Sequence, residues 1–338
     1  MKRSTTCPAL VVLTLSLGLV LAAGSAPAQT KLKMAQATLA LSFAPVYIAH
    51  HLKYWAQEGL EVDLQLVSGV VGSQALTGGT VEFDADGTNN IVRLAGRGID
   101  AVVVYGLVGP FSQNLVMANP TARAKGISPA SPIATKLAAL KGLTLGITTP
   151  GSLGDTFTRY LLKQANLDPG RDVQIVQVGS TDGLLAAIQT GQIQAFLMSP
   201  PAPETAEARG HGSVVLRAGL EIPVLRSFVQ SSVGVMRPYM ERNGDTIRRV
   251  NRALARATAL LLDHPEEAKQ VLQASYFQRI PPEILSKSVD GFRPAYLRDG
   301  RMTEEQWRNM LKVFQELGMV PRPLDSMEGK VWTNQFLP

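Results

Sequence analysis

The stretch Glu61-Val62-Asp63-Leu64-Gln65-Leu66-Val67 alternates polar and apolar residues from Glu61 to Leu66. Because successive side chains of a strand point to opposite faces, this pattern predicts a β-strand with one buried face. Residues 44–57 before it have the apolar spacing of a helix, and residues 73–76 after it predict a short helix that ends at Gly78-Gly79. The strand therefore stands between two helices, which is the arrangement of an α/β sheet.

Strands and helices continue to alternate along the chain on both sides of that strand. We expect further strands at 31–37, 83–86 and 101–107, and a helix at 89–96. Such a β-α-β-α-β-α-β series predicts a mostly parallel sheet covered by helices. The segment 119–132 is rich in Pro, Ser and Ala, and we predict a crossover or surface loop there.

A second series follows, with the order and spacing of the first but without repeating its residues. Its strands and helices are expected at 144–148, 152–165, 173–178, 182–190, 194–198, 202–209 and 214–217, followed by a strand at 228–236 and helices at 245–262, 265–274, 282–290 and 303–317. This order predicts an α/β fold of two lobes, with 29–112 and 228–338 forming lobe I and 113–227 forming lobe II. The segments near 106–116 and 219–235 would join the lobes as a two-strand hinge.

The first 28 residues predict a cleaved export signal. A basic start precedes an apolar run at 9–23, and small residues follow at 26–28, the pattern that a signal peptidase reads. We place the cut before Gln29, because the run is shorter than the roughly 20 residues that a membrane span needs. Cys7 is the only cysteine and would leave with this segment, so we expect neither disulfides nor a thiol nucleophile. The expected location is the periplasm.

Charge and motifs argue against several function classes. The formal net charge of +6 is spread along the chain, so no nucleic-acid partner is expected. The four histidines, His50, His51, His211 and His264, lack metal spacing with nearby acids. We find no Walker loop, no GxGxxG after a strand, no GxSxG and no HExxH, and we expect no metal, no cofactor and no catalytic residues.

One local concentration of charge lies on the helix predicted at 245–262. Arg248, Arg252 and Arg256 recur every four residues there. We interpret them as a solvated helix face opposite apolar positions, with docking to a partner as the alternative.

Four segments carry motifs of moderate specificity that occur in a fixed order. They are Phe43-Ala44-Pro45-Val46-Tyr47-Ile48-Ala49 with Tyr54-Trp55-Ala56-Gln57-Glu58-Gly59-Leu60-Glu61-Val62, then residues 75–83, then Leu140-Lys141-Gly142-Leu143-Thr144-Leu145-Gly146-Ile147 with Pro150-Gly151-Ser152, and then residues 185–195 with Pro200-Pro201. Together they resemble the sulfonate/nitrate/taurine binding proteins of ABC importers, the NMT1/THI5-like family. The resemblance implies the type II periplasmic-binding-protein fold, a ligand held between lobes, and an ABC permease as partner. Gln194-Ala195 departs from the family's usual Asp-Ala, which bears on a turn near the cleft.

Ligands of open α/β sheets bind beyond the carboxyl ends of the strands, and two facing sheets give two such rims. On the rim of lobe I we expect Ser42, Phe43, Ala44, Gly87, Thr88, Asn89 and Tyr105. On the rim of lobe II we expect Thr149, Gly151, Ser152, Leu153, Ser180, Thr181 and Ser199. Helices begin at several of these positions, so free amides and the positive end of the helix dipole would favour an anion.

Each of these site residues also has a purely structural interpretation. The Pro-Gly-Ser sequence can be an ordinary turn and cap, and the two aromatic residues Phe43 and Tyr105 can pack on the core instead of forming apolar walls. Two further acids have the same two interpretations. We expect Asp86 to cap the following helix, with contact to a ligand amine as the alternative, and Glu204 to be an ordinary acid at a helix start, with ligand contact as the alternative.

The sequence therefore predicts a monomeric solute-binding protein that captures a small organic carboxylate or sulfonate and delivers it to an ABC permease. A neutral pyrimidine is the alternative ligand. The alternative roles are a solute-sensing subunit for a membrane receptor and a pyrimidine-synthesis enzyme on the same fold. That enzyme is disfavoured, because such enzymes are intracellular and carry a cysteine-rich segment that this chain lacks.

Overall fold

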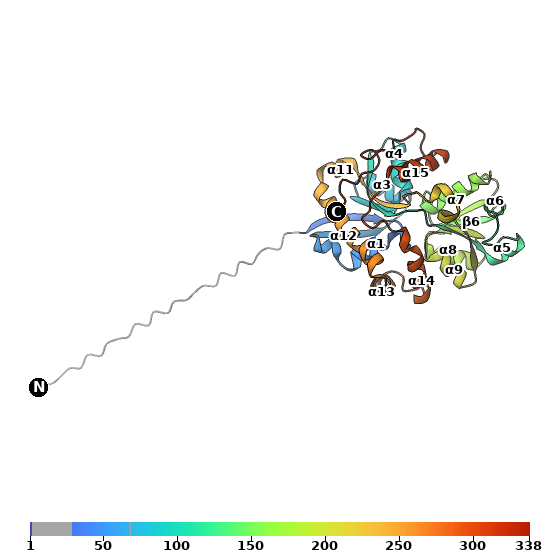
Figure 1. The fold of residues 1–338 in the computed structure, drawn as a ribbon, viewed down its shortest axis with the longest axis horizontal. Helices are drawn as coiled ribbons and strands as arrows, with labels where there is room; N and C mark the ends of the chain where they lie inside the picture. Colours follow the sequence, from blue (N-terminus) through green and yellow to red (C-terminus); the bar gives the residue numbers. More distant parts are fainter. Residues whose placement is uncertain (2–28, 68) are drawn as a thin grey trace.

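The computed structural model describes Met1, residues 29–67 and residues 69–338. The predicted export signal, apart from Met1, lies outside the described residues, as does Cys7. The described chain forms two five-stranded sheets with helices on their faces (Figure 1). We call each sheet with its helices a lobe. The predicted α/β class with two lobes is confirmed.

The first sheet is completed by a strand from late in the chain. Its order is β2 (Leu60–Leu66), β1 (Thr30–Gln36), β3 (Phe83–Gly87), β10 (Ser231–Met236) and β4 (Ala101–Val108). β1 pairs in parallel with β2 and β3, whereas β10 lies antiparallel between β3 and β4. The strand predicted at 61–67 is β2, and its register with β1 begins at Thr30 and Leu60.

The second sheet has a similar plan. Its order is β7 (Gln174–Gln177), β6 (Thr144–Ile147), β8 (Ala195–Met198), β5 (Asn114–Ala118) and β9 (Gly212–Arg217). β6 is parallel to β7 and β8, and β5 is antiparallel to both β8 and β9. Each sheet therefore holds four strands that run in one direction and one antiparallel strand, β10 or β5, which lies between two of them.

The segment after β4 contains two elements that the sequence did not predict. Residues 114–118 form β5, and the loop expected at 119–132 begins with a helix, α5 (Asn119–Ala124), so the expectation of a loop throughout is wrong. Pro120 lies in the first turn of α5, where the missing N–H of proline costs no helical hydrogen bond. A further short helix, α6 (Ile133–Ala138), precedes β6.

The helices cover both faces of each sheet. Those of the first lobe are α1 (Ala44–His51), α2 (Tyr54–Gln57), α3 (Val70–Thr77), α4 (Asn89–Gly96), α11 (Arg237–Arg242), α12 (Gly244–Asp263), α13 (Pro265–Ser275), α14 (Pro282–Phe292) and α15 (Glu304–Glu316). Those of the second lobe include α7 (Leu153–Gln164), α8 (Thr181–Gln189), α9 (Ala202–Ala208) and α10 (Ala218–Glu221). Figure 1 shows α3, α4 and α15 on one side of the first sheet and α1 and α12 on the other. The single helix predicted at 44–57 is divided, because Lys53 has a left-handed backbone with φ of 55°.

The arginine face of α12 is engaged within the protein. Arg252 forms an ion pair with Glu58 at 2.6 Å. The Arg256 guanidinium lies 4.0 Å from the ring centre of Tyr54, and that of Arg248 lies 5.3 Å from the ring of Phe336. Such contacts use both the charge and the flat face of arginine. The three side chains therefore tie α12 to neighbouring segments of the first lobe.

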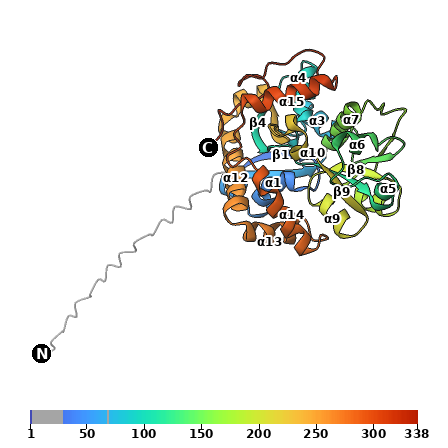
Figure 2. The same cartoon turned by 45° about the vertical axis from the view of Figure 1, so that its right-hand side comes forward.

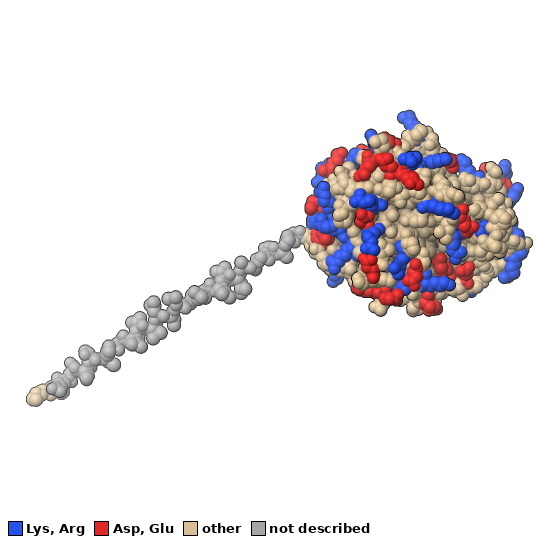
Figure 3. Space-filling view, viewed as in Figure 1, with Lys and Arg blue, Asp and Glu red and all other residues tan. Residues whose placement is uncertain are grey.

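The surface carries mixed charge. Figure 3 shows basic and acidic side chains interspersed over the face in view, without one sign dominating. Along the described residues no helix has both the length and the apolar character needed to cross a membrane.

An aromatic cluster joins the two lobes. Phe157 on α7 of the second lobe lies 4.1 Å from Phe111 and 5.4 Å from Phe228, measured between ring centres. Phe111 and Phe228 belong to the two segments that cross between the sheets. Phe228 in turn lies 5.8 Å from Phe314 on α15 of the first lobe. All four rings are buried, so the lobes share a continuous core at their junction.

Replacement of Phe157 by alanine should lower the free energy of unfolding by about 3–5 kcal/mol, because it removes a buried ring and leaves a cavity. Urea unfolding followed by circular dichroism measures the change. Phe157→Leu serves as the control, because it keeps most of the apolar volume and should cost clearly less. An alanine variant as stable as the wild type would show that this ring does not support the junction.

Candidate functional site

A small cavity lies where the carboxyl ends of parallel strands from both sheets meet. Its volume is about 30 Å³. The residues that line it lie at or just after the carboxyl ends of β1, β3, β6 and β8, or in the segment between β4 and β5. They are Ala37, Thr38, Ala40, Ser42, Phe43, Asp86, Gly87, Gln113, Thr148, Ser152, Leu153, Gly154, Met198 and Ser199. This is the position at which open α/β sheets bind ligands.

Several predicted site residues lie on this cavity. They are Ser42, Phe43, Gly87, Ser152, Leu153 and Ser199. Ser42 of the first lobe donates a hydrogen bond to Ser199 of the second at 2.8 Å, and both side chains are buried. The two predicted rims therefore meet at the cavity.

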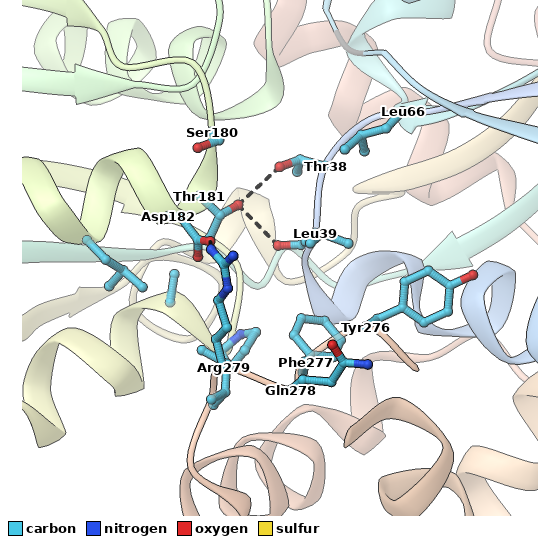
Figure 4. Close-up of a pocket in the computed structure, with 14 residues that line it drawn as sticks. Thr38, Leu39, Leu66, Ser180, Thr181, Asp182, Tyr276, Phe277, Gln278 and Arg279 are labelled. Atoms are coloured by element: carbon cyan, nitrogen blue, oxygen red, sulfur yellow. Dashed lines mark hydrogen bonds and ion pairs between the residues drawn. The ribbon is translucent and has the colours of Figure 1, made fainter. Parts of the chain in front are cut away.

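Other predicted residues contact the opposite lobe instead. Asn89 Nδ2 donates to the carbonyl of Gly151 at 3.1 Å. Thr181 Oγ1 lies 3.0 Å from Thr38 Oγ1 and donates to the carbonyl of Leu39 at 3.1 Å (Figure 4). In this conformation these rim residues hold the lobes against each other.

Three predicted residues do not reach the cavity. Tyr105 is fully buried and packs against Gly300. The prediction that its ring forms an apolar wall of the ligand site is therefore wrong, because the alternation of side chains along β4 turns the ring into the core of the first lobe. Thr88 Oγ1 donates to Ser232 on β10 at 3.0 Å, which places it within the first lobe. Ala44 is buried at the start of α1 beside Phe43 but is absent from the lining.

The remaining predicted residues lie on the second lobe near its edge. Ser180 caps α8 by accepting from the amide of Gly183 at 3.0 Å. Thr149 is partly exposed and lies close to Gly69 of the first lobe. Both residues border the lobe interface outside the cavity lining.

The start of α7 presents free amides to the cavity. Ser152 is the N-cap, as predicted, and its Oγ accepts from the amide of Asp155 at 3.2 Å. The amides of Leu153 and Gly154 have no acceptor within the helix, because the first residues of a helix lack a preceding turn. Both residues line the cavity. Two N–H groups and the positive end of the helix dipole can therefore hold an oxyanion.

Gln230 connects both rims, and sequence reasoning missed it. Its side chain is fully buried. Oε1 accepts from the amide of Ser112 at 2.5 Å, and Nε2 donates to Ser42 Oγ at 3.0 Å and to Ser199 Oγ at 3.3 Å. The only signal available was a glutamine inside the otherwise apolar start of the strand predicted at 228–236.

A larger pocket adjoins the cavity and shares Thr38 with it. Its volume is about 250 Å³. Figure 4 shows Leu39 and Leu66 of the first lobe facing the start of α8, with the turn Tyr276–Arg279 closing one side. Arg279 pairs with Asp182 across the lobes at 3.2 Å. Beside the polar cavity the interface thus offers room for an organic group.

Two buried carboxyl groups lie next to each other on β3. Asp86 accepts hydrogen bonds from the amides of Gly69 and Gly87 at 3.0 and 2.6 Å and from Asn90 Nδ2 at 2.7 Å. Burial still raises the pKa of Asp86 to about 6. Because it bonds to Gly69, which precedes α3, Asp86 does not cap α4 as expected.

Asp84 is the more strongly perturbed member of the pair. It is 1% exposed, and neither carboxyl oxygen has a hydrogen-bond partner within the described residues. Burial, and then the neighbouring charge of Asp86, raise the pKa of Asp84 well above its ordinary value. Burial and the proximity of a second carboxyl group therefore both favour the protonated form of Asp84.

A chain of hydrogen bonds leads from Asp86 to the second lobe. Asn90 donates to Asp86 and accepts from Arg93 Nη1 at 2.6 Å, and Arg93 Nη2 donates to the carbonyl of Gly151 at 3.1 Å. Arg93 was not expected at the site, because only the fold shows that the third residue after Asn90 faces the other lobe. Within 29–67 and 69–338, no group of His, Cys, Asp and Glu side chains is arranged to hold a metal ion.

Known proteins share this architecture. The periplasmic aliphatic sulphonate binding protein SsuA from Escherichia coli matches with a TM-score of 0.65 at 22% identity, over 91% of this chain and 99% of its own. The periplasmic nitrate-binding protein NrtA from Synechocystis PCC 6803 matches with a TM-score of 0.69 at 17% identity, over 89% and 85%. YtlA of Bacillus subtilis (strain 168) is 21% identical over 305 residues, 87% of this chain and 85% of YtlA.

The two sheets, the cavity between them and these structural matches define a protein with the periplasmic-binding-protein fold. Residues 25–275 match the NMT1-like family, and the chain belongs to that family. The family resemblance inferred from the sequence motifs is thereby confirmed.

The buried Asp84 should make stability depend on pH. The pKa of Asp84 is raised in the fold, so the native protein keeps a proton that the unfolded chain has released. The stability that the protonated Asp84 contributes is therefore complete below pH 3.8, and it is lost as the pH rises toward the pKa of the folded state. Asp84→Asn removes the titrating group. Its stability relative to wild type should therefore increase between about pH 5 and pH 8, by at most about 1.4 kcal/mol per pH unit. Urea unfolding across this range measures the difference, and a constant difference would contradict the raised pKa.

Proposed function

We propose that this protein is a periplasmic solute-binding protein that captures a small organic carboxylate or sulfonate between its lobes and delivers it to an ABC permease. The observation that carries the proposal is the cavity at the carboxyl ends of both sheets, which Leu153 and Gly154 at the start of α7 line. The names of the structural relatives SsuA and NrtA, both periplasmic binding proteins, support the same role.

The acid group of the ligand would bind at the start of α7. The amides of Leu153 and Gly154 would supply N–H donors, and Ser42, Ser152 and Ser199 line the same cavity with their hydroxyl-bearing side chains. A single negative charge suits this site, because helix amides and the helix dipole hold an anion without a salt bridge. Asp86 also lines the cavity, but Gly69, Gly87 and Asn90 already donate to its oxygens.

The organic part of the ligand would extend toward the 250 Å³ pocket through Thr38. The cavity itself, at about 30 Å³, is too small for an organic ligand. Ligand entry therefore requires the lobes to separate further than they do here. The Ser42–Ser199 and Thr38–Thr181 contacts form only when the lobes meet, so they stabilise the closed arrangement around a ligand.

This function requires no covalent chemistry, and we propose that the protein is not an enzyme. The lobe boundaries at 112/113 and 227/228, the cleaved signal before Gln29 and a monomeric state belong to the same proposal. The crossing segments would then act as the hinge between lobes that move as units.

A thermal-shift screen should identify the ligand class. The panel contains carboxylates, sulfonates, nitrate and pyrimidines, measured on the protein that begins at Gln29. A true ligand present at 100 times its dissociation constant should stabilise the fold by about 2.7 kcal/mol. The anionic-ligand proposal is wrong if only neutral or cationic compounds raise the midpoint.

Gly151→Leu should abolish that ligand-induced shift. A side chain at this position meets Val70 and Arg93 of the first lobe, so it keeps the lobes apart. Gly179→Leu is the matched control, because Gly179 also has positive φ and lies on the same lobe but has open space around it. Both variants should fold, and only the first should lose the response. Equal ligand-induced shifts in the two variants would show that residue 151 does not lie where the lobes close on the ligand.

A further inference from the structure

One carboxyl group lies on the cavity between the lobes. Of the described residues that line this cavity, Asp86 at the end of β3 is the only one with an acidic or basic side chain. The start of α7, where the acid group of a ligand would bind, lines the same space of about 30 Å³. A bound anion and an ionised Asp86 would therefore lie close together, and two like charges at short range destabilise each other.

The second lobe shields Asp86 from water. Asp86 is 4% exposed, and Thr148, Ser152 and Leu153 of the second lobe line the cavity with it. A side chain added at Gly87 would come within 2.9 Å of Leu153 Cβ, so the lobes are in close contact at the end of β3. Figure 2 shows α3 of the first lobe beside α7 of the second. Separation of the lobes admits water to this place, so closure disfavours the charged form of Asp86.

The hydrogen-bond donors to Asp86 do not distinguish the closed arrangement from an open one. All three belong to the first lobe, namely the amides of Gly69 and Gly87 and the side chain of Asn90. They lower the pKa of Asp86 in both arrangements, whereas burial is the largest influence and raises the pKa to about 6 when the lobes are closed. The part of that burial which the second lobe supplies is lost on opening.

Within the first lobe, Asp86 has one acidic and one basic neighbour. The pKa of Asp84, two residues earlier on β3, is raised by burial and then by Asp86, so its neutral form is favoured. The charge of Arg93 on α4 lowers the pKa of Asp86. Beside this part of β3, the strands β1 and β10 place the uncharged Gln36 and Ser232, and α3 has no charged residue.

The second lobe adds two opposite charges that already pair with each other. Asp155 and Arg159 on α7 form an ion pair at 2.8 Å. With Asp84 neutral, the charges of Asp86 and Arg93 also cancel. An anion at the start of α7 therefore adds one negative charge that nothing in this group compensates, and a proton on Asp86 restores the balance.

We propose that Asp86 takes up a proton when the lobes close on an anion, so that acidic conditions favour capture and alkaline conditions favour release. This inference rests on the proposed solute-binding function and adds a proton to what that site binds. The closed form binds the proton more tightly than the open form does. The resulting stabilisation of the closed form is complete below the lower pKa of the open form, and it is lost as the pH rises through the pKa of the closed form, about 6 without an anion.

Two spin labels can measure closure of the unliganded protein directly. Residues 29–338 contain no cysteine, so Gln74→Cys on α3 and Gln164→Cys on α7 provide unique labelling sites, and both side chains are exposed. Double electron–electron resonance then gives the distances between the labels from about pH 5 to about pH 8. The share of the shorter distance should grow as the pH falls. A distance distribution that is the same at every pH would overturn the proposal.

Substitutions in the doubly labelled protein identify the titrating group. Asp86→Asn keeps the size of the side chain but cannot ionise, so the share of the shorter distance should no longer depend on pH. Asp84→Asn is the matched control, because Asp84 lies on the same strand but does not line the cavity, and it should retain the pH dependence. Circular dichroism checks that both variants are folded. A pH dependence that persists in Asp86→Asn would assign the effect to another group and defeat the proposal.

Methanesulfonate is the probe for the anion, because its single negative charge does not change over this pH range. Isothermal titration calorimetry on the protein that begins at Gln29 should give an association constant that rises as the pH falls, by at most about tenfold per pH unit. Proton uptake should also make the measured heat depend on the ionisation enthalpy of the buffer. Binding that is independent of pH would contradict the proton coupling and leave the solute-binding function intact. Absence of methanesulfonate binding at every pH would instead remove the anion site, and this proposal with it.

Discussion

The buried side chain of Gln230 is the contact on which the two-lobed arrangement depends. It lies at the end of one crossing segment and bonds to Ser112 on the other, to Ser42 on the first rim and to Ser199 on the second. A buried amide that loses its partners is costly, so these segments must keep their positions at this point. Further out, the lobes meet through partly exposed pairs such as Thr38 and Thr181. The bond between Ser112 and Gln230 therefore holds the two crossing segments together, whereas the Ser42–Ser199 and Thr38–Thr181 contacts form when the lobes meet.

The charge of Asp86 at the cavity is balanced through hydrogen bonds instead of a direct ion pair. Asp86 is neutralised on its own side by two amides, and Asn90 connects it to Arg93, which reaches the carbonyl of Gly151. The free amides of α7 then stand opposite this network. An anion can therefore enter the cavity from the second lobe without competing for the partners of the buried acid.

Local patterns in the sequence predicted much of the fold, because they depend on near neighbours. The alternation at 61–67 gave β2, the helix at 89–96 is α4, and Ser152 caps α7. Features set by distant contacts were missed or misplaced. Gln230 bonds to residues 118 and 188 positions away, and alternation along β4 could not show which face of Tyr105 meets the cleft. The antiparallel strand β5 was hidden for the same reason, since its pairing partners lie far along the chain.

The position of β10 sets the order in which the molecule can form. Because β10 separates β3 from β4, neither strand gains its neighbour on that side until the chain has been synthesised to Met236, after the whole second sheet. Pairings over such long separations form slowly, and their loop-closure entropy must be overcome first. During synthesis, β1 to β3 and the whole second sheet can therefore pair before the first sheet is completed, and β4 is the last strand of either sheet to be joined to its neighbours.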